Sequence, residues 1–513
     1  MNPLAKAGFS LSPETSLIPG HEGGIVFRPR PLRALRVNAP AFDLLRKCSN
    51  DQSLNDDGLD ISVRLESTLS FFDRLYQAGL LEWKPPDGDF EPSVSIVVAA
   101  YNRSDEIGSC IESLMSLNYP RLKYEVIVVD DASEDDTCSV VSRYDVKLIR
   151  LDRNQGQSAA RNAGVTEARG EIIAFIDSDC IAEPGWLREL VPYFQDSRNA
   201  LVGGYVATYY RDSVLDRYEE VKSPLNMGRD TLIGTGEESD FYVPTCNMLV
   251  RRDVFLRAGG LNESLRVGED VDFCWKLKEK GCRLVYAPYG TVRHKHRSRF
   301  SDAFKRRFDY GTSEPVLYSR HKAISKHYPW QPTCMAVFFL CGLGLLSGQP
   351  LTAPAGAACF LWDVFCKSRR YRKHIGIAVK FGTVLRASAV RHFDLAYHLT
   401  RHLIRYHLIL MTLIAFMLPT TVPVFVAIVL LPVFTEFFKK KPSLSFPMFL
   451  VLFLTEQVSY QAGVFWGCLR EKSFRPYRLV LTRGTRRRKP AFSTKLKQLG
   501  KVRNSPVISR WPS

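Results

Sequence analysis

Two aspartates, Asp177 and Asp179, stand two residues apart directly after the apolar run Glu171 to Ile176. This spacing puts two hard carboxylate ligands close together, which suits Mg²⁺ or Mn²⁺. A divalent cation held there can bridge a diphosphate and stabilise the departing phosphate. An isolated Asp-x-Asp is also a common solvated turn, because aspartate favours turns. Neighbouring motifs must therefore decide between a metal site and a turn.

A second acidic group follows later in the chain, at Glu269, Asp270 and Asp272. Adjacent carboxylates raise one another's pKa toward the range in which one can accept a proton from a hydroxyl. The structural alternative is the acidic start of a helix, where Asp and Glu complement the helix dipole. Asp272, two residues after Asp270, fits a structural role.

The elements that must position these groups alternate between strand and helix. The β-branched runs 94–100 and 125–130 are typical of strands buried on both faces of a parallel sheet, and residues 105–117 between them have helical spacing. Runs 146–150 and 171–176 predict two further strands, with a helix at 158–168 between them. The pattern indicates an α/β nucleotide-binding domain.

Polar residues follow three of these strands. They are Tyr101-Asn102, Asp130-Asp131 and Asp177-Ser178-Asp179. Because ligands of such sheets bind beyond the carboxyl ends of the strands, we expect all three groups at one edge of the sheet.

The segment Asn154-Gln-Gly156-Gln-Ser-Ala-Ala-Arg161-Asn162-Ala-Gly164 completes an ordered series of motifs, YN, VVDD, NxGxxxARNxG, DSD and ED. With this series the chain resembles the family 2 glycosyltransferases of the GT-A fold, from about Ser93 to His296. The fold that the resemblance implies is a Rossmann-like mixed sheet.

The resemblance also implies roles for individual residues. Tyr101 would stack on a uracil, Asp131 would accept its imide N–H, and Asp270, preceded by Glu269, would be the base of an inverting transfer. Asp179, Asp177 and His294 would hold the cation, with His296 a competing candidate. The residues implied to bind the nucleotide sugar are Ala99, Tyr101, Asn102, Asp131, Arg161, Asp177 and Ser178.

Composition sets the limits of the whole chain. With 513 residues, 45% hydrophobic and 24% charged, the protein is neither largely disordered nor wholly membrane-embedded. We expect a tail at 1–23, a small module at 24–88, the transferase domain at 92–325, an apolar helical region at 326–475 and a basic tail at 476–513. The small module resembles winged-helix, PqqD-like peptide-recognition domains, and a helical cap is the alternative.

The net charge of +17 is concentrated beside apolar segments. This placement favours anionic lipid over nucleic acid, for which we find no binding motif. Residues 331–362 and 408–435 carry no charge, and each is interrupted by proline, at Pro350 and Pro419 among others. They could be hairpins dipping into a bilayer, full crossings, or helices packed on the protein. Basic flanks place the catalytic domain on the cytosolic side of the cytoplasmic membrane.

Two further segments, Arg306 to Ser313 and Ser459 to Gly467, are similar to patterns of the mycofactocin-system glycosyltransferases. The chain departs from that pattern at Gln461-Ala462, where a glycine is expected. The similarity implies transfer of glucose from UDP-glucose to a peptide-derived redox cofactor, mycofactocin.

Two alternatives remain. A lipid-linked or envelope polysaccharide acceptor would also explain the apolar region. A non-catalytic sugar-nucleotide or peptide-binding scaffold is disfavoured by the pairing of DSD with ED, since a binder needs no base.

Overall fold

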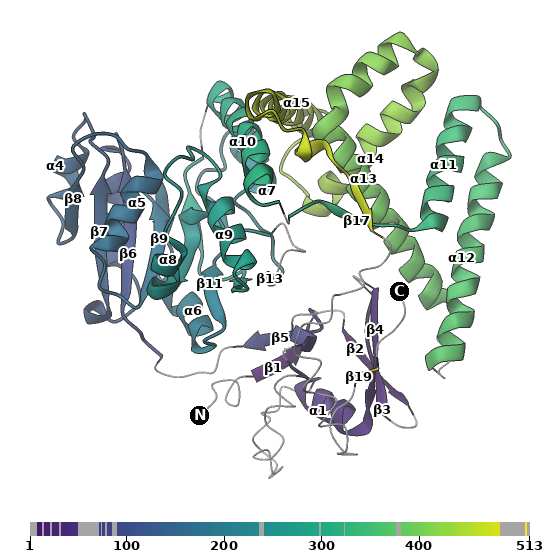
Figure 1. Ribbon diagram of the computed structural model, residues 1–513, viewed down its shortest axis with the longest axis horizontal. Coiled ribbons are helices and arrows are strands. Elements are labelled where there is room, and N and C mark those ends of the chain that lie inside the picture. Colours follow the sequence, from purple (N-terminus) through teal and green to yellow (C-terminus); the bar gives the residue numbers. More distant parts are fainter. Residues whose placement is uncertain are drawn as a thin grey trace.

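The protein, seen here as a computed structural model, consists of an α/β domain, a small N-terminal module and a helical C-terminal region (Figure 1). The structure describes residues 8–12, 15–20, 23–29, 32–49, 71–72, 74–76, 79–84, 90–234, 241–296, 299–322, 324–375, 381–482 and 508–509.

An eight-stranded mixed sheet forms the centre of the α/β domain, in the order β13-β15-β11-β14-β9-β6-β7-β8. Strands β9, β6, β7 and β8 are parallel, whereas β14 is antiparallel to β9 and β11. The bounds are β6 Val94–Ala100, β7 Tyr124–Asp130, β8 Lys147–Arg150, β9 Ile172–Asp177, β11 Asn199–Gly203, β13 Leu232–Gly234, β14 Met248–Arg251 and β15 Arg283–Tyr286. The predicted parallel strands and mixed GT-A-type sheet are confirmed.

Helices cover both faces of the sheet, because its central strands are apolar on both sides. On one face, α5 packs through Ala160 and Val165. A Cβ at Gly164 of α5 would lie 2.5 Å from Val97 Cγ1, so glycine permits this close packing on β6. The helices are α3 Ile107–Met115, α4 Thr137–Val141, α5 Gln157–Thr166, α6 Trp186–Leu190, α7 Val214–Lys222, α8 Arg252–Ala258 and α9 Glu269–Glu279.

A second, three-stranded sheet lies at the carboxyl end of β9. Its strands are β10 Cys180–Ala182, β16 Val292–His294 and β12 Val206–Thr208, with β16 in the middle. The chain leaves β9 at Asp177 and enters β10 at Cys180, which pairs with His294 in an antiparallel ladder. This pairing brings a distant histidine beside the Asp-x-Asp segment.

The N-terminal module contains a meander of β2 Ser16–Gly20, β3 Gly23–Pro29 and β4 Leu32–Asn38, followed by helix α1 Ala39–Ser49. Strand β1, Gly8–Leu11, pairs with β5, Leu81–Lys84, and β19, Ile508–Ser509, pairs with β4. Strands thus begin inside the predicted 1–23 tail, where Phe9 is buried in the core. Residues 50–70 of the predicted small module lie outside the described residues. The winged-helix resemblance stays a prediction.

In the described part of the chain, helices α10 to α15 follow the sheet domain, and two pairs of them, α11 with α12 and α13 with α14, form hairpins. The chain reverses between α11 and α12 next to Pro350, and between α13 and α14 at Pro419, so both predicted breaks are confirmed (Figure 1). The bounds are α10 Phe300–Arg320, α11 Pro332–Ser347, α12 Thr352–Ile375, α13 Phe381–Met417, α14 Val422–Lys440 and α15 Phe446–Glu471. A short strand between α10 and α11, β17 His327–Pro329, pairs in parallel with β18, Val480–Thr482, which follows α15.

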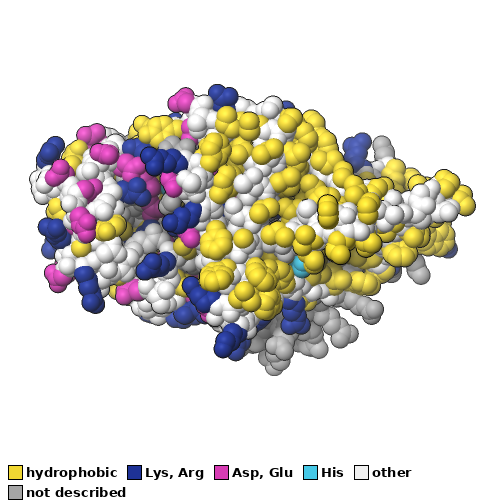
Figure 2. All heavy atoms as spheres, turned by 90° about the horizontal axis from the view of Figure 1, so that it is seen from above, with side chains coloured by type: hydrophobic (Ala, Val, Ile, Leu, Met, Phe, Trp, Pro, Cys, Tyr) yellow, Lys and Arg dark blue, Asp and Glu magenta, His cyan; other side chains and the backbone are white. Residues whose placement is uncertain are grey.

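The hairpin turns carry apolar side chains into solvent. Phe416 and Met417 are 87% and 77% exposed, and Leu351 of the other turn is also exposed. Figure 2 shows an apolar surface over the C-terminal helices and mixed charge over the sheet domain. Within the described chain, Pro419–Lys440 and Phe446–Glu471 are long and apolar enough to cross a bilayer, but half of the most apolar window of the second is buried in the protein.

Candidate active site

A cavity of about 1230 Å³ opens where β6, β7 and β9 end. In the ladders Ala99 lies opposite Asp177 and Ala100 opposite Asp130, so the predicted clustering at one sheet edge is confirmed. The predicted residues that line the cavity are Ala99, Tyr101, Asp131, Arg161, Asp177, Ser178, Asp179, Glu269, Asp270, His294 and the competing candidate His296.

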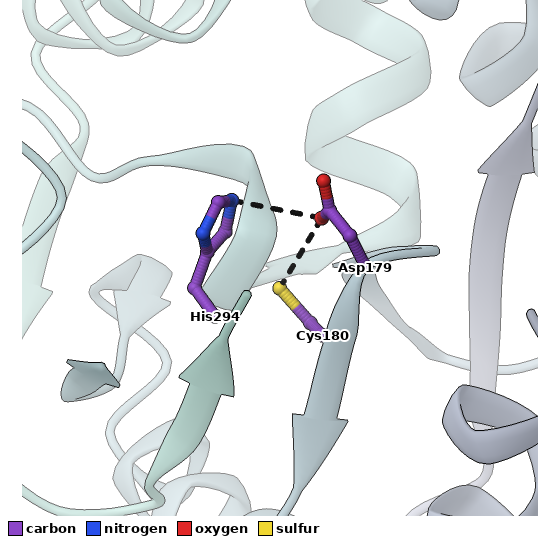
Figure 3. A group of neighbouring side chains, drawn as sticks. All are labelled: Asp179, Cys180 and His294. Atoms are coloured by element: carbon purple, nitrogen blue, oxygen red, sulfur yellow. Dashed lines mark hydrogen bonds and ion pairs between the residues drawn. The ribbon is translucent and has the colours of Figure 1, made fainter. Parts of the chain in front are cut away.

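Three side chains at the ends of β10 and β16 point their ligand atoms toward one another (Figure 3). These atoms, from Asp179, Cys180 and His294, lie within 4.8 Å of one another. His294 Nε2 is 3.6 Å from Asp179 Oδ1, and its buried Nδ1 has no hydrogen-bond partner among the described residues. Burial raises the pKa of the Cys180 thiol, and Mg²⁺ and Mn²⁺ prefer oxygen ligands to sulfur. The remaining carboxylate and imidazole fit a divalent cation.

A buried arginine joins the two acidic groups found in the sequence. Arg161 of α5 donates to Asp177 Oδ1 at 2.5 Å and to Glu269 Oε1 at 3.1 Å. Gln157 also donates to Glu269 Oε1, at 2.6 Å. Burial alone would raise the pKa of Asp177, but Arg161 holds it below its ordinary value. Arg161 therefore fixes the first turn of α9 relative to the end of β9.

Asp270 stands next to Glu269 in that turn and is half-buried in the cavity wall. Its Oδ1 accepts the backbone N–H of Val271 at 2.8 Å. Burial raises the pKa of Asp270 to about 7, and the negative charge of Glu269 adds to the shift. A carboxylate with this pKa can accept a proton near neutral pH.

Asp272 belongs to a different environment. It is fully buried and accepts hydrogen bonds from Arg320 Nε at 3.1 Å and His321 Nε2 at 3.0 Å. These contacts tie α9 to the end of α10, which agrees with a structural role.

The residues after β6 and β7 form the opposite side of the cavity. Tyr101 presents a partly exposed ring. Asp131 accepts the backbone N–H groups of Gln155 at 2.7 Å and Gly156 at 2.8 Å, so its carboxylate holds the loop before α5. Each oxygen keeps a lone pair for a ligand.

Asn102 differs from its predicted place. Its side chain is not among the lining groups of the described cavity, and its Oδ1 accepts the Glu134 N–H at 2.9 Å. Its own N–H donates to Ser133 Oγ at 2.9 Å, and its φ of 52° is left-handed, a conformation that asparagine tolerates. Asn102 therefore shapes the turn after β6.

Sequence reasoning missed the wall formed by α10. Its residues Asp302, Ala303, Arg306, Arg307 and Tyr310 line the cavity, as do Arg103, Tyr210 and Glu219 from other elements. Their recurrence every three or four residues along α10 is the amphipathic signal that could have identified this face. Arg103 Nη2 lies 3.5 Å from Asp179 Oδ2 and adds positive charge beside the candidate metal ligands.

Comparison with known proteins finds relatives among the glycosyltransferases. Residues 95–258 match the family described as Glycosyl transferase family 2. The chain is 30% identical over 307 residues to a pre-mycofactocin glycosyltransferase of Mycobacterium tuberculosis. The matched region covers 58% of this chain and 61% of that protein, so the chain spans less than two thirds of this relative's length. It is also 30% identical over 230 residues to the glycosyltransferase AglE of Haloferax volcanii, covering 44% of this chain and 73% of AglE.

Solved structures to which the chain is similar include a mannosyltransferase from Pyrobaculum calidifontis in complex with GDP-Man and Mn²⁺. It has a TM-score of 0.39 at 18% identity and covers 64% of this chain and 96% of its own. TarS residues 1–349 from S. aureus with UDP-GlcNAc has a TM-score of 0.35 at 20% identity, covering 52% and 79%. On the match of residues 95–258 and the coverage of AglE, the chain belongs to glycosyl transferase family 2.

Proposed function

We propose that this protein is an inverting hexosyltransferase that moves glucose from UDP-glucose to pre-mycofactocin. The observation that carries the proposal is that Asp270, with its raised pKa, faces the same cavity as Asp179 and His294. A proton acceptor and a set of metal ligands across one cavity are what transfer from a nucleotide diphosphate sugar requires. The identity to a pre-mycofactocin glycosyltransferase supports the choice of acceptor.

The donor is held from the strand ends. The ring of Tyr101 stacks on the uracil, and a remaining lone pair of Asp131 accepts the uracil imide N–H. Ala99 and Ser178 line the same cavity. Arg161 keeps Asp177 oriented toward the ribose and diphosphate.

Asp179 and His294, with Asp177 nearby, would hold Mg²⁺ or Mn²⁺. When bound, the cation supplies charge stabilisation for the departing diphosphate. Nε2 of His294, which lies 3.6 Å from Asp179 Oδ1, and the carboxylate of Asp179 are chemically suited to this role. Arg103 brings a fixed positive charge to the same side of the cavity.

Asp270 acts as the general base. It removes the proton of the acceptor hydroxyl while that oxygen forms a bond to the anomeric carbon of the donor sugar. The bond from the anomeric carbon to the diphosphate oxygen breaks, and UDP leaves with the electron pair. Attack from the face opposite the leaving group inverts the anomeric configuration, and Asp270 keeps the proton.

A second acceptor class is favoured by the apolar surface of the C-terminal helices. A lipid-linked or envelope polysaccharide would reach the cavity from a bilayer, and the exposed turns at Leu351 and Phe416 are suited to insert into one. In this proposal the protein lies on the cytosolic face of the membrane, with both hairpins dipping into it rather than crossing.

The test is mass spectrometry of synthetic pre-mycofactocin after incubation with the detergent-solubilised protein, UDP-glucose and Mn²⁺, with EDTA as the control. Hexose additions that EDTA abolishes support the reaction and the acceptor. Release of UDP without hexose addition would shift the acceptor to a lipid-linked glycan. Donor binding with neither transfer nor UDP release would indicate a non-catalytic scaffold.

A further inference from the structure

Helix α10 lies between the active-site cavity and the C-terminal helices. One side of it lines the cavity with Arg306, Arg307 and Tyr310 among others. Its other side packs along α15, which lies next to it in space although more than a hundred residues separate them in the chain (Figure 1). Any displacement of α10 on α15 therefore changes the wall of the active site.

Glycines let the two helices meet backbone to backbone. A Cβ added at Gly463 would overlap the carbonyl group of Phe308, and one added at Gly311 would overlap the backbone of α15. At Gly467 it would lie 2.6 Å from the carbonyl oxygen of Thr312. Backbone atoms cannot rotate aside as a flexible side chain can, so any larger residue here would push α10 away from α15.

A buried carboxylate of α10, Glu314, fixes the contact laterally. It accepts hydrogen bonds from Tyr406 Oη at 2.5 Å, Tyr460 Oη at 2.8 Å and Lys326 Nζ at 2.6 Å. Burial alone would raise the pKa of Glu314, but Lys326 holds it below its ordinary value. The three donors come from α13, α15 and the segment after α10, so Glu314 binds α10 to all of them.

A second buried group reaches the cavity itself. Arg307 Nη2 donates to both carboxylate oxygens of Glu219 on α7 at 2.8 Å, and its Nε lies 3.5 Å from Glu456 on α15. Glu456 also accepts from Tyr218. Since Arg307 and Glu219 both line the cavity, α15 contributes to holding its wall.

The cavity side of this arrangement rests against the helix of the proposed base. A Cβ at Gly268, the residue before α9, would lie 3.1 Å from Ser313 Oγ of α10. At the other end of the contact, Arg320 donates to Asp272 of α9 at 3.1 Å. The turn that carries Asp270 therefore sits on α10.

We infer that α15 is a positioning element for the transfer step, in which Tyr460 and Gly463 fix α10 and α10 fixes the turn that carries Asp270. The inference rests on the proposed role of Asp270 as base. A shift of α10 would change the approach of Asp270 to the acceptor hydroxyl, where an error of about 1 Å can cost on the order of 100-fold in rate. Tyr101 and Asp131 stand at the ends of β6 and β7 and would keep their donor contacts.

The experiment compares Gly463→Ala and Tyr460→Phe with two matched controls in the full chain. At Gly342 an added Cβ would meet no atom within 4 Å, so Gly342→Ala repeats the first change in open space. Tyr397 donates to Glu436 at 3.1 Å, so Tyr397→Phe removes a tyrosine–glutamate bond between α13 and α14. The quantities measured are kcat for transfer, KM for UDP-glucose and the dissociation constant of UDP.

For the two test variants, kcat should fall roughly tenfold or more, with UDP affinity within about twofold of wild type. The controls should match wild type. Because Tyr460→Phe removes only a hydroxyl, its kcat alone decides the test if Gly463→Ala does not fold. An unchanged kcat in Tyr460→Phe overturns the inference. So does a parallel loss of kcat and UDP affinity, which indicates general damage. Absence of transfer by the wild type would overturn the proposed function as well, whereas wild-type transfer with active variants overturns this inference alone.

Discussion

Cys180 and His294 are partners in an antiparallel ladder, although more than a hundred residues separate them. The ladder sets the position of the His294 ring, because the residue before Cys180 is Asp179 and the imidazole lies beside its carboxylate. The candidate metal site at the end of β9 thus depends on the register of two strands of three residues each.

We expect Mn²⁺ binding to depend on His294. His294→Ala should weaken Mn²⁺ binding about tenfold or more, because even mutation of a residue that only hydrogen-bonds to a metal ligand lowers metal affinity by this much. Isothermal titration of metal-free protein measures the affinity. His327→Ala, which removes an exposed histidine, is the control. Equal Mn²⁺ affinity in the two variants would remove His294 from the ligand set.

Asp270→Asn should abolish transfer and preserve donor binding. An amide cannot accept the acceptor proton, and loss of a general base costs roughly 10²–10⁴-fold in rate. Transfer by the wild type should also decline below about pH 7, where Asp270 becomes protonated. Initial rates over a pH series measure both effects. Asp253→Asn on the exposed surface of α8 is the control, and a fully active Asp270→Asn variant would exclude the assignment.

Asp270→Asn should stabilise the protein at alkaline pH. The Asp270 carboxyl titrates at about 7 when folded and near 3.8 when unfolded, so the native state binds a proton that the unfolded state releases. The contribution of the protonated Asp270 carboxyl to the free energy of unfolding is present at low pH and is lost as pH rises through the folded pKa. The increase in Tm of Asp270→Asn over wild type should therefore be larger at about pH 8 than at about pH 5.5 in thermal denaturation. A constant difference would show that Asp270 is ionised throughout.

Removing the buried guanidinium between the two acidic groups should destabilise the fold. Arg161→Met leaves Asp177 and Glu269 without their shared cation, and breaking a buried pair in this way costs about 3–5 kcal/mol. Arg257→Met breaks an exposed pair with Asp253 and should cost at most about 1 kcal/mol. Thermal denaturation compares the variants. Adding Glu269→Gln should restore part of the loss, because one of the unpaired charges is then absent.

Lipid binding should depend on the hairpin turns. Replacing Phe416 and Met417 by serine removes apolar surface that the folded protein leaves exposed. Flotation with anionic phospholipid vesicles should decrease, and Tm should stay unchanged. Leu122→Ser changes an exposed leucine of the sheet domain and should float like the wild type. Undiminished flotation of the double variant would place the lipid contact elsewhere.

Local pattern predicted the parallel strands and the residues at their ends. Val94–Ala100 and Ile172–Asp177 are β-branched runs buried on both sides, so composition alone identifies them. Proline likewise marked the two hairpin turns. These features depend on the residues within a single element.

Contacts between distant elements could not be predicted in this way. The strands β10 and β16 are too short to show a period, so nothing local places His294 beside Asp179. Glu269 was predicted to assist Asp270, yet its carboxylate accepts from Arg161 and Gln157 on α5. Whether it also affects catalysis stays a prediction.

The glycine contact between α10 and α15 has a consequence for biosynthesis. Helix α10 ends at Arg320, but its partner α15 spans Phe446–Glu471 and leaves the ribosome much later. While the intervening helices are being translated, α10 does not yet have α15 to pack against. Transfer competence should therefore arise only when α15 has left the ribosome, after the apolar hairpins have had the opportunity to reach a membrane.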